Sequence, residues 1–299
     1  MKSKGRVNMK NVVMLENLKC FNIGQILESG QVFRFEKISD SSYLLNAKQK
    51  LIKIIQQQDS DTLLIHNATL SELDEIWSHY LDIDTDYGHI IQVLSQKDEY
   101  MAKAVAFGEG IRILRQDPWE MLISFIISQN KAIPQIKQCI KNLSQQFGDP
   151  IDEYEEQDKM YYTFPTVHQL ARASEEALRD CKVGFRAPYI MDACQKVLNE
   201  EVILNDLCIC TAEEAKNKLM SIKGVGPKIA DCILLFAYSK SEVFPTDVWI
   251  KRVIEGIYFK GKETSLKVIQ DFARQYFGEL AGYAQQYLFF YGREHQLFK

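Results

Sequence analysis

The chain has 299 residues, enough for about two domains. Apolar residues make up 46% of it and charged residues 25%, which excludes a disordered, collagen-like or coiled-coil protein. With 36 Lys and Arg against 40 Asp and Glu, the net charge is −4. This charge argues against a protein that coats nucleic acid through bulk attraction but leaves room for a local basic face.

No apolar run approaches the roughly 18–20 residues that a membrane span needs. The start of the chain, residues 1–6, is basic but no apolar segment follows it, so we expect no secretory signal and no membrane partner. The seven cysteines are scattered, and their spacing suits neither a zinc nor an iron–sulfur site. We therefore expect reduced thiols, no cofactor and a cytoplasmic location, associated with the nucleoid in a prokaryote.

Short β-rich runs occupy residues 32–35, 42–45, 51–55 and 62–65, with turn-prone residues between them. Strands this close together predict an antiparallel sheet. Helical periodicity dominates from about residue 100, and the clearest predicted helix, over 133–147, ends at Gly148. The predicted fold class is α+β, with a small antiparallel sheet domain and flanking helices over residues 1–105 and a larger helical domain over 106–299.

A hairpin between two predicted helices, over residues 219–232, is the first candidate site. Gly224 and Gly226 permit positive φ and, with Val225 between them, leave bare backbone at the surface. Pro227 suits the first position of the second helix. The free N–H groups at such a helix start form an anion site that fits a DNA phosphate. A plain helix–turn–helix corner packed in the core explains the glycines equally well.

Lys228 follows in the first turn of that helix, where the positive end of the macrodipole disfavours a second positive charge. A partly desolvated amine at this place is a candidate nucleophile. Cys232 lies four residues further on and shares the helix face of Lys228. A solvated surface lysine and a cysteine that fills the core are the simpler interpretations.

Asp247 lies nineteen residues after Lys228, two residues after Pro245, and is well placed as the N-cap of a further helix. The carboxylate is then either a simple cap or a charge held by helix N–H groups and directed at an active site. Asp247 distinguishes these interpretations only together with Lys228.

In combination, these features resemble 8-oxoguanine DNA glycosylase of the eukaryotic type, in the helix-hairpin-helix, Gly/Pro…Asp (HhH-GPD) superfamily. The resemblance covers most of residues 21–291, in the order and close to the spacing of the family. Besides the hairpin, Lys228 and Asp247, it rests on the segments 28–34, 114–120, 124–130, 184–187 and 282–285. It implies a helical domain of two lobes with the active site in the cleft between them.

The resemblance implies that Lys228 attacks C1′ of the damaged nucleoside and forms a Schiff base, and that β-elimination then nicks the strand. It makes Asp247 the group that stabilises the cationic sugar. The flipped base would be read by the Gly30 carbonyl, held between Cys232 and Phe289, and bound at its pairing edge by Gln285. Core packing explains Gln285 and Phe289 equally well.

On the DNA side, the resemblance implies that Asn130 fills the gap in the duplex, Phe185 wedges between base steps and Arg186 contacts the unpaired cytosine. The simpler interpretation makes Phe185 a loop anchor and Arg186 a surface charge. The resemblance also suggests a monovalent cation at three hairpin carbonyls, those of Met220, Ile222 and Val225.

Three positions depart from the family pattern. Gln135 replaces an arginine that helps to recognise cytosine, which weakens the expected preference for the opposite base. Trp249 replaces a histidine near a phosphate, and Lys223 replaces a frequent proline. Endonuclease III and adenine-glycosylase relatives usually carry four C-terminal cysteines for an iron–sulfur cluster, whereas the last cysteine here is Cys232.

The sequence thus predicts a monomeric bifunctional DNA glycosylase and abasic-site lyase that acts on double-stranded DNA containing an oxidised purine. A sibling glycosylase with another damaged base and a non-catalytic HhH DNA-binding module are the alternatives.

Overall fold

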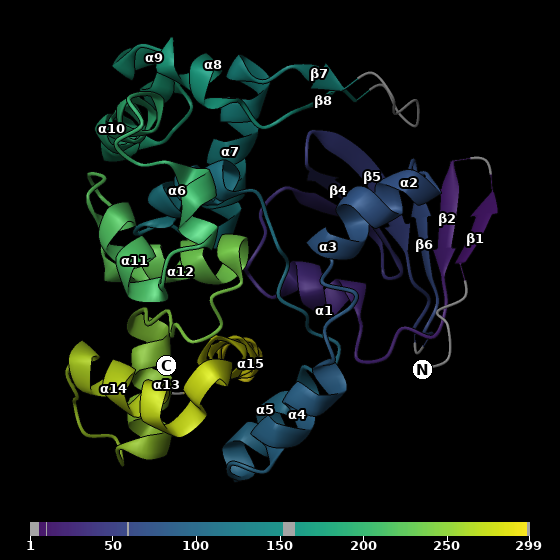
Figure 1. Cartoon of the computed structure of the whole chain (residues 1–299), viewed down its shortest axis with the longest axis vertical. Coiled ribbons are helices and arrows are strands. Elements are labelled where there is room, and N and C mark those ends of the chain that lie inside the picture. Colours follow the sequence, from purple (N-terminus) through teal and green to yellow (C-terminus); the bar gives the residue numbers. More distant parts are fainter. Residues whose placement is uncertain (1–5, 10, 59, 152–158, 298–299) are drawn as a thin grey trace.

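The computed structural model describes residues 6–9, 11–58, 60–151 and 159–297. The described chain forms a sheet domain on one side and two stacked helical lobes on the other (Figure 1). Three buried hydrophobic clusters correspond to these three units. The predicted α+β class and the division of the helical part into two lobes are confirmed.

The sheet is antiparallel, with the strand order β1-β2-β6-β5-β4-β3. Its core side packs against α1 (Ile23–Glu28) and a continuous helical segment over residues 70–80, which contributes Trp77 and Tyr80. That segment consists of α2 (Leu70–Glu72), a π-helical turn (Leu73–Trp77) and α3 (Ser78–Tyr80). The strands are β1 (Arg6–Met9), β2 (Val12–Leu15), β3 (Phe35–Ser39), β4 (Ser42–Ala47), β5 (Lys50–Ile55) and β6 (Leu63–His66).

Three of the four predicted strands are present, whereas β1 and β2 were not predicted. The run over residues 32–35 is not a strand, because β3 begins only at Phe35. Phe33 instead packs against Phe125 of the first helical lobe, and the Arg34 guanidinium pairs with Glu120. Tertiary contacts with the helical part thus override the β propensity of this run.

The first helical lobe, which we call the hairpin lobe, contains α6 to α12. The predicted helix over 133–147 is confirmed, as is the capping box formed by Thr211 and Glu214. The helices are α6 (Pro118–Ser128), α7 (Ile133–Phe147), α8 (Val167–Ala171), α9 (Glu175–Asp180), α10 (Ala187–Leu198), α11 (Ala212–Met220) and α12 (Pro227–Tyr238), and a small ribbon is formed by β7 (Pro150–Ile151) and β8 (Tyr161–Tyr162).

The second helical lobe, the terminal lobe, combines two early helices with the last three. Its members are α4 (Tyr87–Ser95), α5 (Glu99–Phe107), α13 (Val248–Tyr258), α14 (Leu266–Phe277) and α15 (Ala281–Glu294). Because α4 and α5 share a core with α15, residues 87–107 pack with the end of the chain and not with the sheet. The boundary placed between residues 105 and 106 therefore falls inside α5. None of the helices in the described part of the chain is long and apolar enough to span a bilayer.

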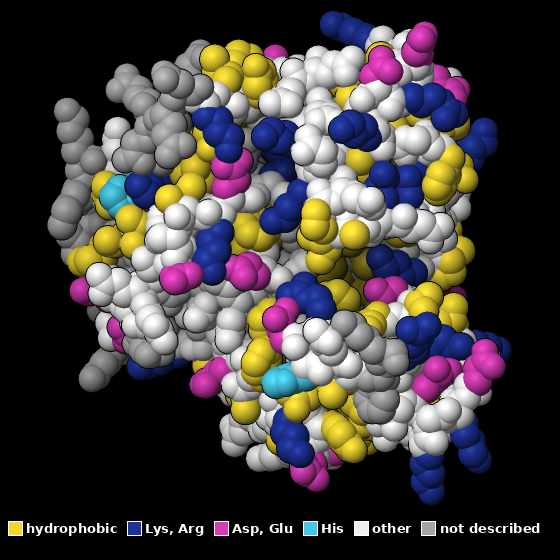
Figure 2. All heavy atoms as spheres, turned by 180° about the vertical axis from the view of Figure 1, so that it is seen from behind, with side chains coloured by type: hydrophobic (Ala, Val, Ile, Leu, Met, Phe, Trp, Pro, Cys, Tyr) yellow, Lys and Arg dark blue, Asp and Glu magenta, His cyan; other side chains and the backbone are white. Residues whose placement is uncertain are grey.

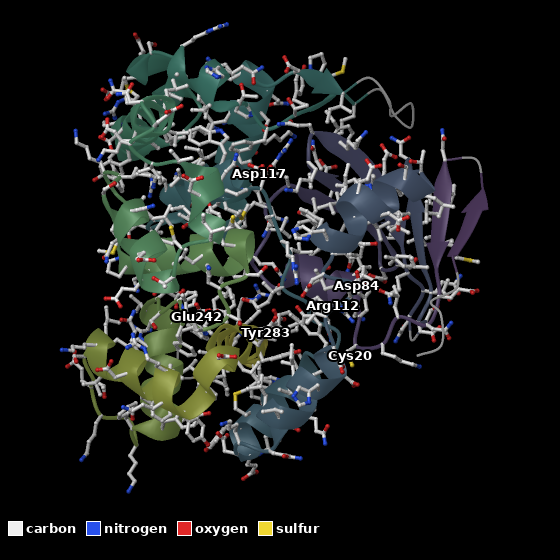
Figure 3. All side chains as sticks on the ribbon, in the orientation of Figure 1. Cys20, Asp84, Arg112, Asp117, Glu242 and Tyr283 are labelled. Carbon is white, nitrogen blue, oxygen red and sulfur yellow. The ribbon has the colours of Figure 1, made fainter. Side chains whose placement is uncertain are left out.

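Arg112 lies where the sheet domain, α4 and α15 meet (Figure 3). Its guanidinium donates to the main-chain carbonyls of Lys19 at 2.7 Å, Cys20 at 3.1 Å and Asp82 at 2.7 Å, and lies 4.4 Å from the centre of the Tyr87 ring. Burial lowers the pKa of Arg112. Since each carbonyl accepts one of its N–H groups, the buried cation is satisfied by hydrogen bonds and joins the sheet domain to the start of α4.

Candidate active site

The hairpin predicted over residues 219–232 joins α11 to α12. Gly224 has φ +79°, and a Cβ built on it would lie 2.3 Å from Cδ2 of Tyr189, so both its backbone and its surroundings require glycine. Gly226 differs from the expectation, because its φ is −91° and a Cβ there would meet nothing within 4 Å. Gly226 is the N-cap of α12, and Pro227 is its first residue, as predicted.

Lys223 has a structural role that a proline at this position would lack. Its main-chain N–H donates to Oδ2 of Asp192 at 2.7 Å, a bond that proline has no hydrogen to form. Its ammonium lies 3.8 Å from the other oxygen of the same carboxylate. Lys223, which replaces the frequent proline of the family, therefore connects the hairpin to α10.

The carbonyls suggested for a monovalent cation belong to the same turn. The Ile222 carbonyl already accepts a hydrogen bond from the N–H of Val225 at 3.0 Å, and the ammonium of Lys196 donates to the neighbouring Ser221 carbonyl. A cation held by Met220, Ile222 and Val225 stays a prediction. Within the described ranges, no three His, Cys, Asp or Glu side chains gather in a way that would hold a metal ion.

Lys228 and Asp247 line one cleft of about 1060 Å³. Lys228 comes from the start of α12 in the hairpin lobe, and Asp247 from the start of α13 in the terminal lobe. Asn130 and Trp249 line the same cleft. The structure thus brings the two predicted catalytic residues together from opposite lobes, as the resemblance implied.

The Lys228 side chain is half-buried, and its ammonium lies 5.4 Å from the centre of the Phe125 ring. It also lies near the Cys232 thiol. Burial raises the pKa of that thiol to about 11, although the nearby Lys228 charge acts in the opposite direction. Cys232 is therefore a neutral neighbour of the amine. Neither this thiol nor the aromatic ring fixes the amine as an ion pair in the way that a carboxylate would.

Asp247 is the N-cap of α13, as predicted. One carboxylate oxygen accepts the Ile250 N–H at 2.7 Å, which fixes the side chain at the helix start. The half-buried carboxylate also borders the cleft. The cap and a role in the cleft are thus compatible, because a carboxylate has a second oxygen that can face a reacting group.

The predicted base-pocket residues come together only in part. Gly30 has φ +88°, and a Cβ on it would lie 3.1 Å from Cε1 of Phe289, so these two residues are neighbours despite their separation in the sequence. Two side chains of α15 hold the segment before Gly30, since Gln286 donates to the Ser29 carbonyl at 3.1 Å and Arg293 to the Glu28 carbonyl at 2.7 Å.

The remaining two pocket residues are buried. Gln285 is buried on α15, and its Oε1 has no hydrogen-bond partner. A buried unpaired amide oxygen is rare in native structures and is free to accept from a ligand. None of Gly30, Cys232, Gln285 and Phe289 is among the residues that line the 1060 Å³ cleft, so their common role in holding a base stays a prediction.

Arg186 is not a surface charge, which corrects the simpler interpretation. It is only 3% exposed and donates to the carbonyls of Val183, at 3.0 Å, and Gln129. Burial lowers its pKa. Because Gln129 precedes Asn130, Arg186 ties the turn that carries Phe185 to the turn that carries Asn130.

Phe185 and Asn130 are exposed. The Phe185 ring is 50% exposed, lies 4.2 Å from the Arg186 guanidinium and makes an edge contact with Tyr189 at 6.1 Å. Asn130 has φ +49°, a left-handed conformation that asparagine tolerates better than most residues. Both side chains are available to a partner, and contact with DNA stays a prediction for each.

Two departures from the family pattern have a clear local geometry. Gln135 is exposed in the first turn of α7, where its Oε1 accepts the Ala132 N–H at 3.2 Å. The Trp249 ring lines the cleft, but its Nε1 is buried without a partner and lies close to Gly292. In this conformation the indole N–H cannot reach a phosphate.

Further cleft residues were not assigned roles from the sequence. Lys131, Lys251 and Arg252 supply positive charge, and Thr264 and Ser265 supply hydroxyl groups before α14. Ser265 caps that helix, which is the one sequence signal that marks it. On the face shown in Figure 2, lysine and arginine side chains border the hollow between the upper and lower helical parts. A local basic face thus exists on a protein of net charge −4.

The comparisons with known proteins agree with this geometry. The chain belongs to the HhH-GPD superfamily of base excision DNA repair proteins, whose model matches residues 123–276. Within that superfamily, residues 13–122 match the N-terminal domain of 8-oxoguanine DNA glycosylase.

Three relatives illustrate the similarity. The chain is 32% identical to a probable N-glycosylase/DNA lyase of Methanothermobacter thermautotrophicus over 77% of each chain. It is 31% identical to the N-glycosylase/DNA lyase of Saccharomyces cerevisiae, over 79% of this chain and 68% of the yeast protein. The 8-oxoguanine glycosylase/lyase of Clostridium acetobutylicum, solved with double-stranded DNA containing cytosine opposite 8-oxoguanine, is 40% identical and superposes with a TM-score of 0.94, covering 99% of this chain and 100% of that one.

Proposed function

We propose that this protein is a bifunctional DNA glycosylase and abasic-site lyase that excises 8-oxoguanine from double-stranded DNA. The observation that carries the proposal is the placement of Lys228 and Asp247 in one cleft, each at the start of a helix from a different lobe. The similarity of the N-terminal part to 8-oxoguanine glycosylases supports the choice of base. We further propose that the protein acts as a monomer in the cytoplasm.

In this proposal the Lys228 amine bonds to C1′ of the flipped nucleoside. The glycosidic bond breaks, its electron pair leaves with the base, and the base takes up a proton. Ring opening gives an imine between Lys228 and the sugar, and loss of a proton from C2′ expels the 3′ phosphate. The Asp247 carboxylate stabilises the positive charge that develops on the sugar.

The test is borohydride trapping on a duplex that contains 8-oxoguanine. Borohydride reduces an imine to a stable amine, so the wild-type protein is expected to become attached to the DNA, and Lys228→Gln is expected to abolish this product. Lys223→Gln, on the same hairpin, is the matched control and retains trapping. A covalent adduct that survives in Lys228→Gln would overturn the assignment of the nucleophile.

The base opposite the lesion gives a second measurement. Gln135 offers an amide where the family pattern has a guanidinium, so we expect only a slight preference for cytosine over adenine. Excision rates that differ by more than about two orders of magnitude, or roughly 2.7 kcal/mol, would contradict this expectation.

The same duplex panel distinguishes the alternatives. A sibling glycosylase would trap on duplexes with another damaged base and not on 8-oxoguanine. A non-catalytic HhH module would bind all duplexes and trap on none. The amine and carboxylate in one cleft favour an enzyme, since a phosphate clamp requires neither.

A further inference from the structure

A second cavity lies between the sheet domain and α7, and it shares no lining residue with the cleft of Lys228 and Asp247. Its volume is about 340 Å³, near the lower end of the range for small-molecule sites in proteins. Its walls combine aromatic rings with polar and charged side chains. Phe33 and Phe35 come from the segment that leads into β3, and Tyr161 and Tyr162 come from β8.

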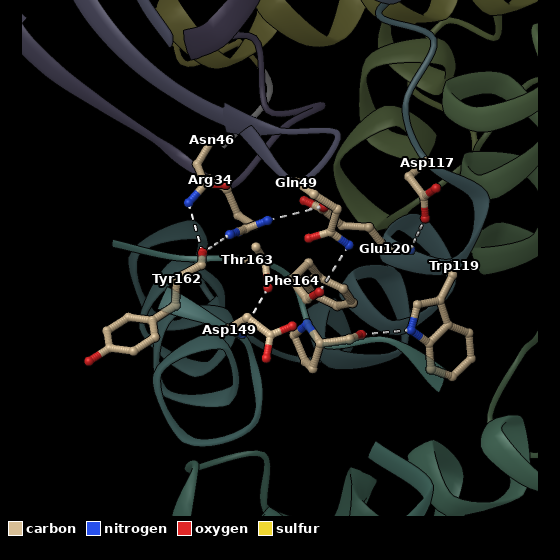
Figure 4. Close-up of polar contacts among 11 residues, drawn as sticks. Arg34, Asn46, Gln49, Asp117, Trp119, Glu120, Asp149, Tyr162, Thr163 and Phe164 are labelled. Carbon is tan, nitrogen blue, oxygen red and sulfur yellow. Dashed lines mark hydrogen bonds and ion pairs between the residues drawn. The ribbon is translucent and has the colours of Figure 1, made fainter. Parts of the chain in front are cut away.

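The walls of this cavity are fixed by polar contacts between the sheet domain and the hairpin lobe (Figure 4). The Arg34 guanidinium lies 3.3 Å from the Glu120 carboxylate and also donates to the Tyr162 carbonyl. Asn46 donates to the same carbonyl at 2.9 Å. Because these contacts hold the sheet domain and the hairpin lobe together beside the cavity, the walls of the cavity do not depend on a bound ligand.

Lys137 is half-buried in the cavity wall, and its ammonium forms no ion pair among the described residues, although the Glu28 and Glu36 carboxylates act on it from a longer distance. It lies 3.3 Å from the centre of the Phe35 ring, a cation–π contact. Lys159, by contrast, pairs with Glu36, and Lys141 is exposed. Burial lowers the pKa of Lys137 to about 8, so the group is desolvated yet still mostly protonated at neutral pH.

We propose that this cavity binds a small planar aromatic molecule that carries one negative charge. Phe33, Phe35 and Tyr162 line the cavity with their aromatic side chains, and the Lys137 ammonium beside the Phe35 ring can pair with the negative charge of a ligand. An anion beside a desolvated ammonium forms a strong charge-assisted hydrogen bond. The volume accommodates one or two fused rings and excludes a peptide or a dinucleotide.

The cavity lies near two segments that carry predicted DNA-recognition residues, the one after Gly30 and the start of α7 with Gln135. Phe33 and Phe35 follow Gly30 by only a few residues, and Lys137 lies half a turn beyond Gln135 on α7. A bound molecule would therefore hold α7 against the sheet without entering the catalytic cleft. The proposal does not depend on the reaction catalysed by Lys228.

The test uses 2-naphthoate and its neutral analogue 2-naphthamide in isothermal titration calorimetry at pH 7. We expect naphthoate to bind wild-type protein at least tenfold more tightly than naphthamide. Lys137→Met is expected to reduce this ratio to about one, and Lys267→Met, which changes an exposed lysine of α14 outside the cavity, is the control expected to leave it unchanged. Equal affinities on wild-type protein, no binding of naphthoate, or a ratio unaffected by Lys137→Met would overturn the proposal.

A measurement on the wild-type protein removes any dependence on the folding of the variants. Reductive methylation with formaldehyde and cyanoborohydride, followed by peptide mass mapping, reports the reactivity of each amine. Saturating naphthoate is expected to slow the labelling of Lys137 at least fivefold and to leave the labelling of Lys267, outside the cavity, unchanged. Equal labelling of Lys137 with and without naphthoate would contradict the proposed site.

Discussion

The two hairpin glycines have different physical roles, and a pair of alanine substitutions separates them. In Gly224→Ala, the new side chain must adopt φ near +79°, which costs about 1–2 kcal/mol for a residue with a Cβ. Its Cβ also falls 2.3 Å from Cδ2 of Tyr189, so the ring must move by about an ångström, and such overpacking costs roughly 1–3 kcal/mol. The expected loss is about 2–5 kcal/mol in the free energy of unfolding.

Thermal denaturation followed by circular dichroism measures this loss, and we expect the Tm of Gly224→Ala to fall by roughly 5–15 °C. Gly226→Ala is the matched variant, because a Cβ at Gly226 meets nothing within 4 Å and its φ is −91°. Its stability should change by less than about 1 kcal/mol, the difference between glycine and alanine at an N-cap.

DNA affinity should show the opposite order. On the proposed function, the methyl group of Gly226→Ala stands between the start of α12 and a phosphate, and we expect affinity for duplex DNA to fall at least about tenfold, or 1.4 kcal/mol. Fluorescence anisotropy at fixed salt measures this. A Gly224→Ala protein as stable as wild type would refute the conformational argument, and a Gly226→Ala protein with unchanged affinity would refute the phosphate argument.

Three further predictions follow from other contacts. Asp247→Ala should cost about 1 kcal/mol through loss of the cap, whereas Asp247→Asn should retain stability within a few tenths and still lose borohydride trapping, as denaturation and trapping assays will show. In the wild type the Lys216 ammonium lies 2.7 Å from the buried Asp231 carboxylate, and Lys216→Met leaves this carboxylate without its ion-pair partner. We expect a loss of about 3–5 kcal/mol in the free energy of unfolding, most of which the double variant with Asp231→Leu recovers. A smaller loss in the single variant would contradict the burial argument. Lys137→Met should be more stable than wild type at pH 7 by about 1 kcal/mol, because the folded protein lowers the pKa of Lys137 to about 8 and so disfavours its charge, while solvent screens this half-exposed ammonium. Between about pH 8 and pH 10.5 the unfolded chain binds more protons at Lys137 than the folded one, so wild type should gain stability and the difference should shrink; a constant difference in urea denaturation across this range would show that Lys137 is not desolvated.

The local part of the structure was predictable from the sequence because it depends on neighbouring residues. The helix over 133–147, the caps at Thr211 and Asp247 and the proline at the start of α12 are all set within a few residues of chain. The strand expected over 32–35 was displaced because Phe33 and Arg34 contact the helical lobe, and no local pattern contains that information.

The sequence indicated candidate site residues but not their geometry. The spacing of Lys228 and Asp247 in the sequence indicated a candidate catalytic pair, and the fold places both residues in one cleft. The buried state of Arg186 and of the Trp249 indole N–H depends on residues far away in the chain, so composition and spacing gave no indication of either. The hydrogen bond from the Lys223 N–H to Asp192 could not be predicted for the same reason.

The acceptors of the Arg112 guanidinium are main-chain carbonyls, which take up no proton in mildly acidic or alkaline solution. An interface held by carboxylates would weaken when acid protonates them, whereas the hydrogen bonds from Arg112 to main-chain carbonyls are retained. On the proposed function, a damaged duplex thus meets a sheet domain and an α4 that are already joined. None of the free energy released by contact with the nucleic acid is then needed to join these two parts, and it remains available to bend and unstack the double helix.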